Sequence, residues 1–174
     1  MKKFIAILLA LMLLGLSAAS LAEGNTDMTS VTVTKVYKLV GAGSSPAETF
    51  TLEQVGAGRV TSGEATEAPA LGTITGAAFE AGAATEDGAK GEITIALPTY
   101  TNVGVYEYTL QEVAGKTAGV AYYGEQIRLV VTVINDETGN LRVAAVHTES
   151  VGGEKSDTFE NTYSAGTLNV TKTV

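Results

Sequence analysis

The stretch VGVYEYTLQEV at residues 103–113 alternates apolar and polar side chains along its length. Tyr106, Tyr108 and Leu110 fall on one face, and the polar residues between them fall on the other. Because successive side chains of a β-strand point to opposite faces, this alternation predicts a strand with one buried face.

The same alternation recurs along the chain, whereas no stretch after residue 22 keeps a sustained helical period. Strands are predicted at residues 31–40, 49–55, 91–97, 103–113, 126–134, 141–148 and 158–163, with weaker candidates at 71–80 and 119–123. Residues 56–90 are rich in Gly, Ala, Thr and Glu and predict a long, partly irregular excursion with a short strand or two. The pattern predicts an all-β fold, a β-sandwich of about 7–9 strands.

The N-terminal residues 1–22 are interpreted as a signal peptide. Lys2 and Lys3 precede an apolar run from Phe4 to Leu16, which is too short to span a bilayer comfortably, and SLA at 20–22 is a small-x-small cleavage site. An uncleaved anchor is the alternative. Cleavage after this site predicts a secreted protein that is not inserted in the membrane.

The rest of the chain is divided into three parts. Residues 23–30 are predicted to be a flexible N-terminus, and residues 31–164 are predicted to form one β-sandwich domain. Residues 165–174 follow as a linker and a strand, because TLNVTKTV at 167–174 repeats the pattern of VTVTKV at 31–36. This last strand is interpreted as the first strand of a following, incomplete domain.

Composition excludes several classes of function. The chain has 11 Lys plus Arg against 19 Asp plus Glu, and this acidity argues against nucleic acid and anionic membrane surfaces as partners. The absence of Cys excludes a Cys nucleophile, a lipoprotein anchor and a Cys-based metal site. His147 is interpreted as a structural strand-end residue, and Asp136 with Glu137 as part of a hairpin loop without the alternating oxygen ligands of a calcium site. No cofactor and no metal are predicted.

Three polar residues fall on the apolar faces of their predicted strands: Lys35, Glu112 and Asn161. An unpaired amine, carboxyl or amide in a core is costly, so three such residues of complementary types are expected to meet. Two alternatives remain open at this point. A one-residue bulge would exchange the faces of a strand, and Lys35 with Glu112 could form an ordinary buried ion pair.

One reaction requires this set of side chains. Burial lowers the pKa of a lysine and makes its neutral amine available as a nucleophile, and it raises the pKa of a glutamate and keeps it protonated. The amine of Lys35 would attack the side-chain carbonyl of Asn161, Glu112 would shuttle the protons, and ammonia would leave. The product is a self-generated amide between the two side chains, formed once, so the protein is not predicted to be a turnover enzyme.

At these residues the sequence resembles the pilin isopeptide linkage domain of Gram-positive major (backbone) pilins of the streptococcal type. The matching pieces are VTK at 33–35, YEYTLQE at 106–112, GVAYYGEQIRLVVTV at 119–133 and FENTY at 159–163. The resemblance implies an Ig-like, Cna-B-like β-sandwich. It also implies that Lys35 bonds to Asn161 with the help of Glu112.

The resemblance further implies a role in the shaft of a sortase-assembled pilus at the cell wall, with other pilin subunits and a sortase as partners. Lys155 is the candidate acceptor for the neighbouring subunit, with a solvated loop lysine as the alternative, and Lys172 is the candidate isopeptide lysine of a following domain. No LPxTG-like sorting signal follows in this sequence, and LPTYT at 97–101 is interpreted as strand and turn. The chain is therefore interpreted as a fragment of a longer pilin or as a secreted protein that is anchored differently.

Two other classes of function are compatible with an exported β-sandwich. A secreted adhesin or carbohydrate-binding module could use the same sandwich to bind host or matrix ligands. A secreted hydrolase is disfavoured because the chain has a single His and no convergent pair of acidic residues.

Overall fold

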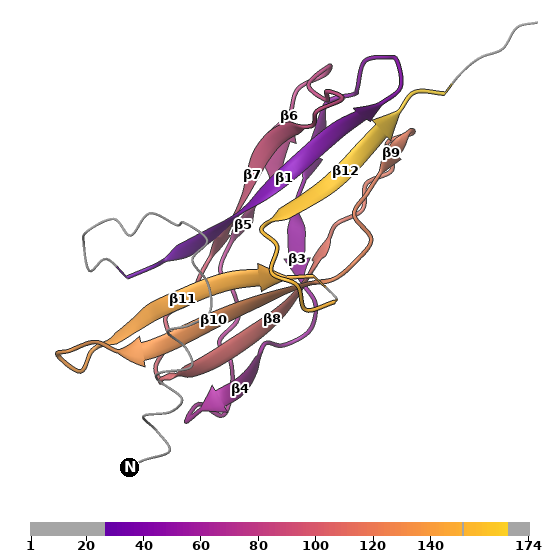
Figure 1. Cartoon of the computed structure of the whole chain (residues 1–174). Helices are drawn as coiled ribbons and strands as arrows, with labels where there is room; N and C mark the ends of the chain where they lie inside the picture. Colours follow the sequence, from indigo (N-terminus) through magenta and orange to yellow (C-terminus); the bar gives the residue numbers. More distant parts are fainter. Residues whose placement is uncertain (1–26, 151, 167–174) are drawn as a thin grey trace, which may run out of the picture.

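The computed structural model describes residues 27–150 and 152–166, and within them the chain forms twelve strands and no helix. The prediction of an all-β fold is confirmed (Figure 1). The strands are β1 (Ser30–Val40), β2 (Glu48–Phe50), β3 (Leu52–Gln54), β4 (Arg59–Gly63), β5 (Ile74–Thr75), β6 (Ala77–Phe79), β7 (Ala89–Ala96), β8 (Gly104–Glu112), β9 (Val120–Ala121), β10 (Ile127–Asn135), β11 (Leu141–Glu149) and β12 (Thr158–Ser164).

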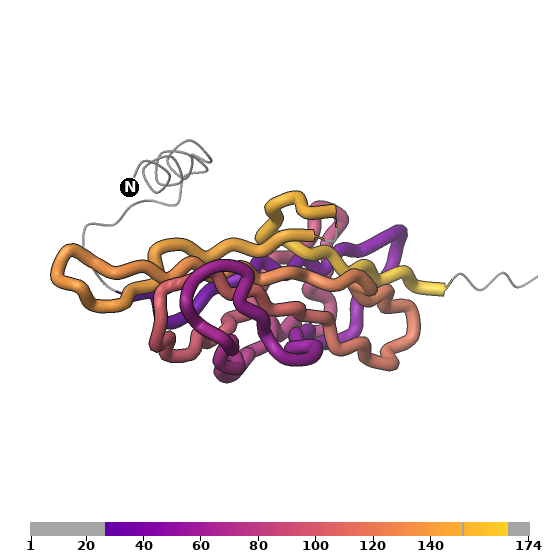
Figure 2. The backbone as a smooth tube through the Cα atoms, turned by 90° about the horizontal axis from the view of Figure 1, so that it is seen from below, coloured from indigo at the N-terminus to yellow at the C-terminus, as the bar shows by residue number. Residues whose placement is uncertain are grey.

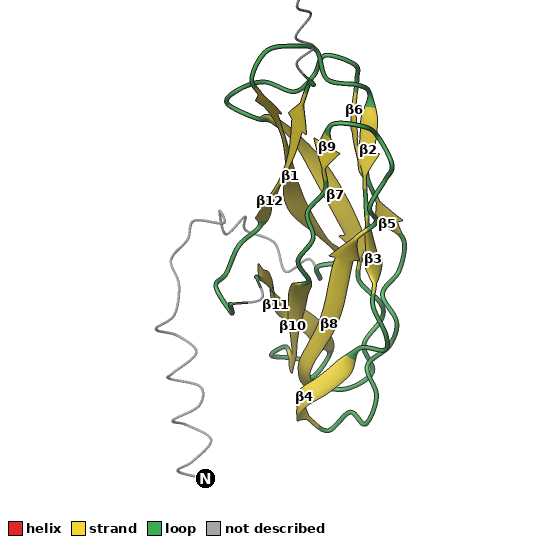
Figure 3. Ribbon diagram, turned by 90° about the vertical axis from the view of Figure 1, so that its right-hand side faces the viewer, coloured by secondary structure: helices red, strands yellow, loops and turns green. Residues whose placement is uncertain are grey.

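The strands form two main sheets and one small sheet. The first main sheet has the order β5-β7-β1-β12-β9, and the second has the order β11-β10-β8-β3 with β4 also paired to β8. Strands β2 and β6 form the small sheet. Figure 3 shows an elongated molecule in which the first sheet lies towards one end and the second sheet towards the other.

The first and last strands of the domain, β1 and β12, are parallel neighbours in the first sheet. Figures 1 and 2 place the end of β12 at one end of the long axis and the β10–β11 hairpin at the other. Since β1 and β12 run in the same direction, the chain enters the sheet at one end of this strand pair and leaves it at the other.

The core lies between the inward faces of the two main sheets. In β8, Tyr106, Tyr108 and Leu110 are buried, as the alternation in the sequence predicts. Aromatic rings fill the end of the core near the small sheet, where Tyr37 packs edge-on against Phe50 with ring centroids 5.0 Å apart. Aromatic pairs of this geometry add to the stabilisation that burial provides.

Two details of the strand prediction differ from the structure. Residues 49–55 form two short strands, because β2 pairs with β6 in the small sheet and β3 then crosses to pair with β8. Strand β4 lies in the excursion 56–90. It pairs with the edge of β8, with a shift in register between Val60 and Ser62, and its residues are mostly exposed, so they show no apolar alternation. A side chain at Gly63 would meet the backbone of Gly104 at 2.5 Å, so the close approach of these strands requires glycine.

Residues 27–30, at the predicted boundary of the domain, contact β11 of the second sheet and the segment after β7 of the first sheet. The backbone N–H of Val143 donates a hydrogen bond to Asp27 Oδ1 at 2.7 Å, and the N–H of Leu97 donates to the carbonyl of Thr29 at 2.8 Å. The predicted signal peptide 1–22 and the predicted strand that carries Lys172 lie outside the described residues. In the part of the chain that is described, no helix is long and apolar enough to cross a bilayer.

Candidate functional site

Strands β1, β12 and β8 bring Lys35, Asn161 and Glu112 together. In the parallel pair, Lys35 lies opposite Phe159, and Tyr37 lies opposite Asn161. Lys35 and Asn161 therefore share the inward face of the first sheet, two residues apart along the strands. Glu112, at the end of β8, belongs to the second sheet. The site bridges the two sheets.

All three side chains are buried. Lys35 and Asn161 are each 1% exposed, and Glu112 is 4% exposed. An amine, an amide and a carboxyl without partners at this depth would each destabilise the fold by about 1–3 kcal/mol or more. Their burial therefore depends on the contacts that they make with one another.

The three side chains form a closed ring of hydrogen bonds. Lys35 Nζ donates to Glu112 Oε2 and, at 2.7 Å, to Asn161 Oδ1. Asn161 Nδ2 donates to Glu112 Oε1 at 2.5 Å. One oxygen of the carboxyl thus faces the lysine nitrogen, and the other faces the amide nitrogen. This arrangement suits a group that takes a proton from one nitrogen and gives it to the other.

The surroundings affect the charge of the amine. Burial lowers the pKa of Lys35 below its usual range, while the hydrogen bond and the charge of Glu112 act in the opposite direction. The Phe50 ring centroid lies 5.3 Å from Lys35 Nζ, and the Tyr123 ring centroid lies 5.7 Å away. The site is therefore an apolar, aromatic enclosure in which a neutral amine is easier to form than in water.

The ring of contacts can support an acyl transfer between side chains. Lys35 Nζ lies beside the amide of Asn161 and can act as a nucleophile once it has lost its proton. Glu112 contacts both nitrogens and can carry that proton. Because the fold already holds the reacting groups in contact, proximity supplies a large part of the rate.

One functional group was missed by the sequence analysis. The backbone N–H of Tyr123, just after β9, donates to Asn161 Oδ1 at 2.8 Å and approaches Glu112 Oε1 at 3.2 Å. Tyr123 lies within the matching stretch 119–133, but no side-chain pattern could single it out, because every residue except proline has this group.

The structure places the remaining candidates away from this cluster. Lys155 is exposed in the loop between β11 and β12, where its backbone forms an isolated antiparallel β-bridge with that of Glu149. His147 hydrogen-bonds to Glu149 at 2.9 Å on β11. Asp136 Oδ1 accepts hydrogen bonds within its own hairpin loop, including one from the N–H of Asn140 at 2.9 Å. Among the described residues, no group of three or more His, Cys, Asp or Glu side chains is placed to hold a metal ion.

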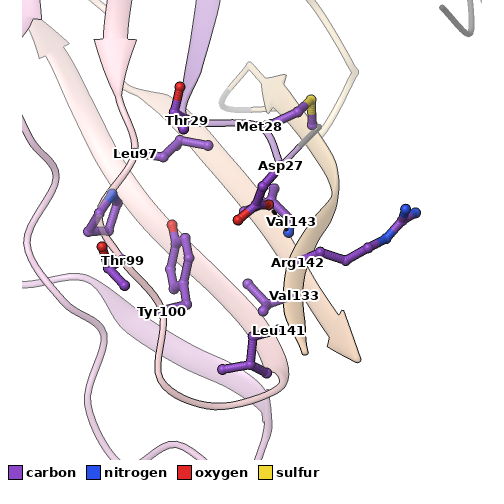
Figure 4. A pocket seen from close by; sticks show the side chains of 11 residues that line it. Asp27, Met28, Thr29, Leu97, Thr99, Tyr100, Val133, Leu141, Arg142 and Val143 are labelled. Carbon is purple, nitrogen blue, oxygen red and sulfur yellow. Dashed lines mark hydrogen bonds between the residues drawn. The ribbon is translucent and has the colours of Figure 1, made fainter. Parts of the chain in front are cut away.

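A surface pocket of about 160 Å³ lies at a different place from the cluster (Figure 4). It is formed where the start of the described chain meets β11 and the segment after β7, and Asp27, Tyr100 and Arg142 are among its lining residues. It contains none of Lys35, Glu112 or Asn161.

The fold and the buried cluster together define a β-sandwich domain with the residues for an internal isopeptide bond. A family model described as FctA, the Spy0128-like isopeptide containing domain, matches residues 31–164. The chain belongs to this family of pilin isopeptide domains. No curated protein matched the sequence.

Solved structures with the same fold include two major pilins of Streptococcus pyogenes. The first is 22% identical with a TM-score of 0.64, and the match covers 79% of this chain and 51% of the pilin. The second, the T-13 protein, is 18% identical with a TM-score of 0.56, covering 79% of this chain and 53% of the pilin. At these identities the likeness shows the fold, and this chain spans about half the length of the pilins that it matches.

Proposed function

We propose that this chain is a structural pilin-type domain in which Lys35 Nζ and Asn161 Cγ become joined by an isopeptide bond. The observation that carries the proposal is the buried ring formed by Lys35, Glu112 and Asn161, in which nucleophile, proton carrier and amide are in direct contact. Membership of the isopeptide-containing family supports the same reaction.

The reaction balances without any external reagent. The ammonium of Lys35 gives a proton to Glu112, and the neutral amine attacks Asn161 Cγ to form a tetrahedral intermediate. Glu112 passes this proton to Asn161 Nδ2, which departs as ammonia, and then takes the second proton from Nζ, so that Glu112 is protonated when the amide has formed. One C–N bond forms and one breaks. Since the product cannot react again, the domain is its own substrate and is not a turnover enzyme.

The position of the bond suits a protein that bears tension. It would join the first and last strands of the domain, β1 and β12, which are parallel neighbours. The chain therefore enters at the start of β1, at one end of the pair, and leaves at the end of β12, at the other. Force applied to the chain would pass from β1 to β12 through covalent bonds and would bypass the residues between them. The similar solved structures are major pilins, which supports a place in the shaft of a pilus at the cell surface.

The remaining proposals concern assembly. Export would follow from cleavage of the signal peptide 1–22, and a sortase would join copies of the protein. Lys155 is the proposed acceptor, because it is exposed in the loop just before β12 and a peptide carboxyl could reach it without unfolding the domain. Residues 165–174 would lead to a following domain in which Lys172 would be the isopeptide lysine.

The mass of the intact protein tests the bond. Folded protein is expected to weigh one ammonia less than its sequence, and Lys35→Ala and Asn161→Ala are each expected to restore the full mass. Lys38→Ala is the matched control, because Lys38 lies on the same strand and its side chain is 41% exposed. A folded wild-type protein whose mass equals that of its sequence, with no loss of ammonia, would refute the proposal.

A further inference from the structure

The acyl-transfer site requires a group that stabilises negative charge on the amide oxygen, and the backbone of Tyr123 offers one. Its N–H donates to Asn161 Oδ1 at 2.8 Å, shorter than its 3.2 Å approach to Glu112 Oε1. Within the described residues, Asn161 Oδ1 accepts hydrogen bonds from this N–H and from Lys35 Nζ.

The two donors behave differently during the reaction. When Lys35 attacks, its lone pair must point at Asn161 Cγ, so Nζ can no longer be held mainly by its hydrogen bond to Oδ1. The N–H of Tyr123 belongs to the backbone and keeps its direction while charge develops on the oxygen. In a site that excludes water, a fixed donor of this kind stabilises the transition state strongly.

The chain around Tyr123 is anchored against β12. Strand β9 pairs with β12 so that Ala121 lies opposite Thr162 and Val120 lies opposite Tyr163. Gly119 makes this approach possible, because its φ is +82° and a side chain there would meet the carbonyl oxygen of Ser164 at 2.6 Å.

Side chains fix the same segment from both sides. Tyr122 donates its hydroxyl to Glu48 Oε2 at 3.0 Å, and the ring of Tyr123 packs edge-on against Phe159 with centroids 5.2 Å apart. The N–H of Tyr123 is therefore directed at Asn161 by contacts that do not involve the reacting atoms. This is the preorganisation that an oxyanion donor needs.

We propose that the backbone N–H of Tyr123 is a catalytic group, the oxyanion donor for the tetrahedral intermediate formed when Lys35 Nζ attacks Asn161 Cγ. The inference rests on the proposed cross-link and adds one element to it. The N–H loses no proton in this step. It holds the oxygen while the C=O bond becomes a single bond, and it releases that oxygen when ammonia leaves and the C=O bond forms again.

A single-atom change tests this role. p-Hydroxyphenyllactate incorporated in place of Tyr123 during cell-free synthesis of the full chain replaces the N–H by an ester oxygen and keeps the aromatic ring. The same ester exchange at Val120, with the corresponding hydroxy acid, is the control. The N–H of Val120 donates to the carbonyl of Thr117 at 3.2 Å, so this ester removes a hydrogen bond from the segment without touching Asn161.

Samples are quenched with denaturant over time. Intact mass reports the loss of ammonia, and resistance to protease before quenching reports folding. The ester at Tyr123 is expected to slow cross-linking by about 10²–10³-fold, so that folded protein of full mass accumulates. The ester at Val120 is expected to cross-link at nearly the wild-type rate. A merely structural hydrogen bond would delay folding but would leave the later loss of ammonia unchanged.

A pair of glycine substitutions keeps the test decisive if the ester hinders folding. Gly119→Ala is expected to displace the segment from β12 and slow cross-linking by up to about 10²-fold, with all three reacting side chains unchanged. Gly124→Ala is the control, because a Cβ there meets nothing within 4 Å.

The outcomes separate this inference from the proposed function. The role of Tyr123 would be overturned, and the cross-link left standing, by either of two results. In the first, the Tyr123 ester and Gly119→Ala both cross-link at the wild-type rate; in the second, the two esters slow cross-linking equally. A wild-type chain that folds without losing ammonia would overturn both.

Discussion

The contribution of the proposed cross-link to stability can be isolated by replacing both charged residues of the site at once. Lys35→Met combined with Glu112→Gln removes the nucleophile and the proton carrier. Replacing both members of a buried ion pair by neutral groups of similar shape is close to neutral for stability, whereas replacing one member leaves a buried charge without a partner. The remaining difference from the wild type is the bond itself.

The size of the effect follows from the loop that the bond closes. Lys35 and Asn161 are 126 residues apart in sequence. By analogy with a disulfide, closing a loop of this length destabilises the unfolded chain by about 5 kcal/mol. With an unfolding entropy of roughly 0.28 kcal/mol/K for a domain of this size, the double variant is expected to melt about 15–20 °C below the wild type.

Calorimetry and urea unfolding of both proteins provide the measurement, with intact mass to verify their covalent state. The urea m-value is expected to rise in the double variant, because an open chain exposes more surface than a closed loop. Lys38→Met with Glu160→Gln is the matched control on β1 and β12, the two strands that the proposed bond would join. That ion pair is 3.8 Å long and about half exposed, so its loss is expected to cost at most about 1 kcal/mol. Equal melting temperatures of a cross-linked wild type and an open double variant would refute the reasoning.

Three further predictions concern the reaction and its use. Glu112→Gln is expected to fold and to cross-link slowly, at a rate that rises with pH until the Lys35 amine is neutral. Because burial lowers the pKa of Lys35, the rise should end at a pH below the usual lysine pKa, and a time course of intact mass that does not depend on pH would contradict this. In single-molecule pulling from the termini, the wild type is expected to extend only by its short tails, whereas Asn161→Ala should release nearly the whole domain; equal extensions would place the bond outside the force path. In sortase assembly with a full-length partner, Lys155→Ala is expected to abolish ladders on a denaturing gel and the exposed Lys90→Ala to leave them intact, and undiminished ladders from Lys155→Ala would reject this acceptor.

The strand pattern of the sequence singles out the three site residues and leaves two alternatives open. Alternation assigns each side chain to a face, and Lys35, Glu112 and Asn161 are the polar members of faces that are otherwise apolar. The structure buries all three faces, so the open alternative of a bulge that exchanges them is wrong. The high cost of burying an unpaired polar group makes such positions informative without any knowledge of the fold.

Other features leave no such trace in the sequence. Strand β4 is held by the edge of β8 and buries little of its own surface, so its residues need no alternation. The division between β2 and β3 depends on which partner each half meets, which is a tertiary property. The N–H of Tyr123 is a backbone group, and its role arises from the direction in which the pairing of β9 with β12 points it.

The order of the reacting groups along the chain would make the proposed bond a consequence of complete folding. Glu112 is 77 residues from Lys35 and 49 residues from Asn161, and the two sheets must close before the three side chains meet. Before closure, water solvates the amine and keeps it protonated, and the amide lacks its donors. After closure, the same burial that lowers the pKa of Lys35 also supplies the aligned partners. Since β12 is the last strand of the domain, the proposed bond could not form in a chain still being synthesised until all the strands of the domain are present. The proposed covalent bond would therefore fix only a fold whose core has already assembled.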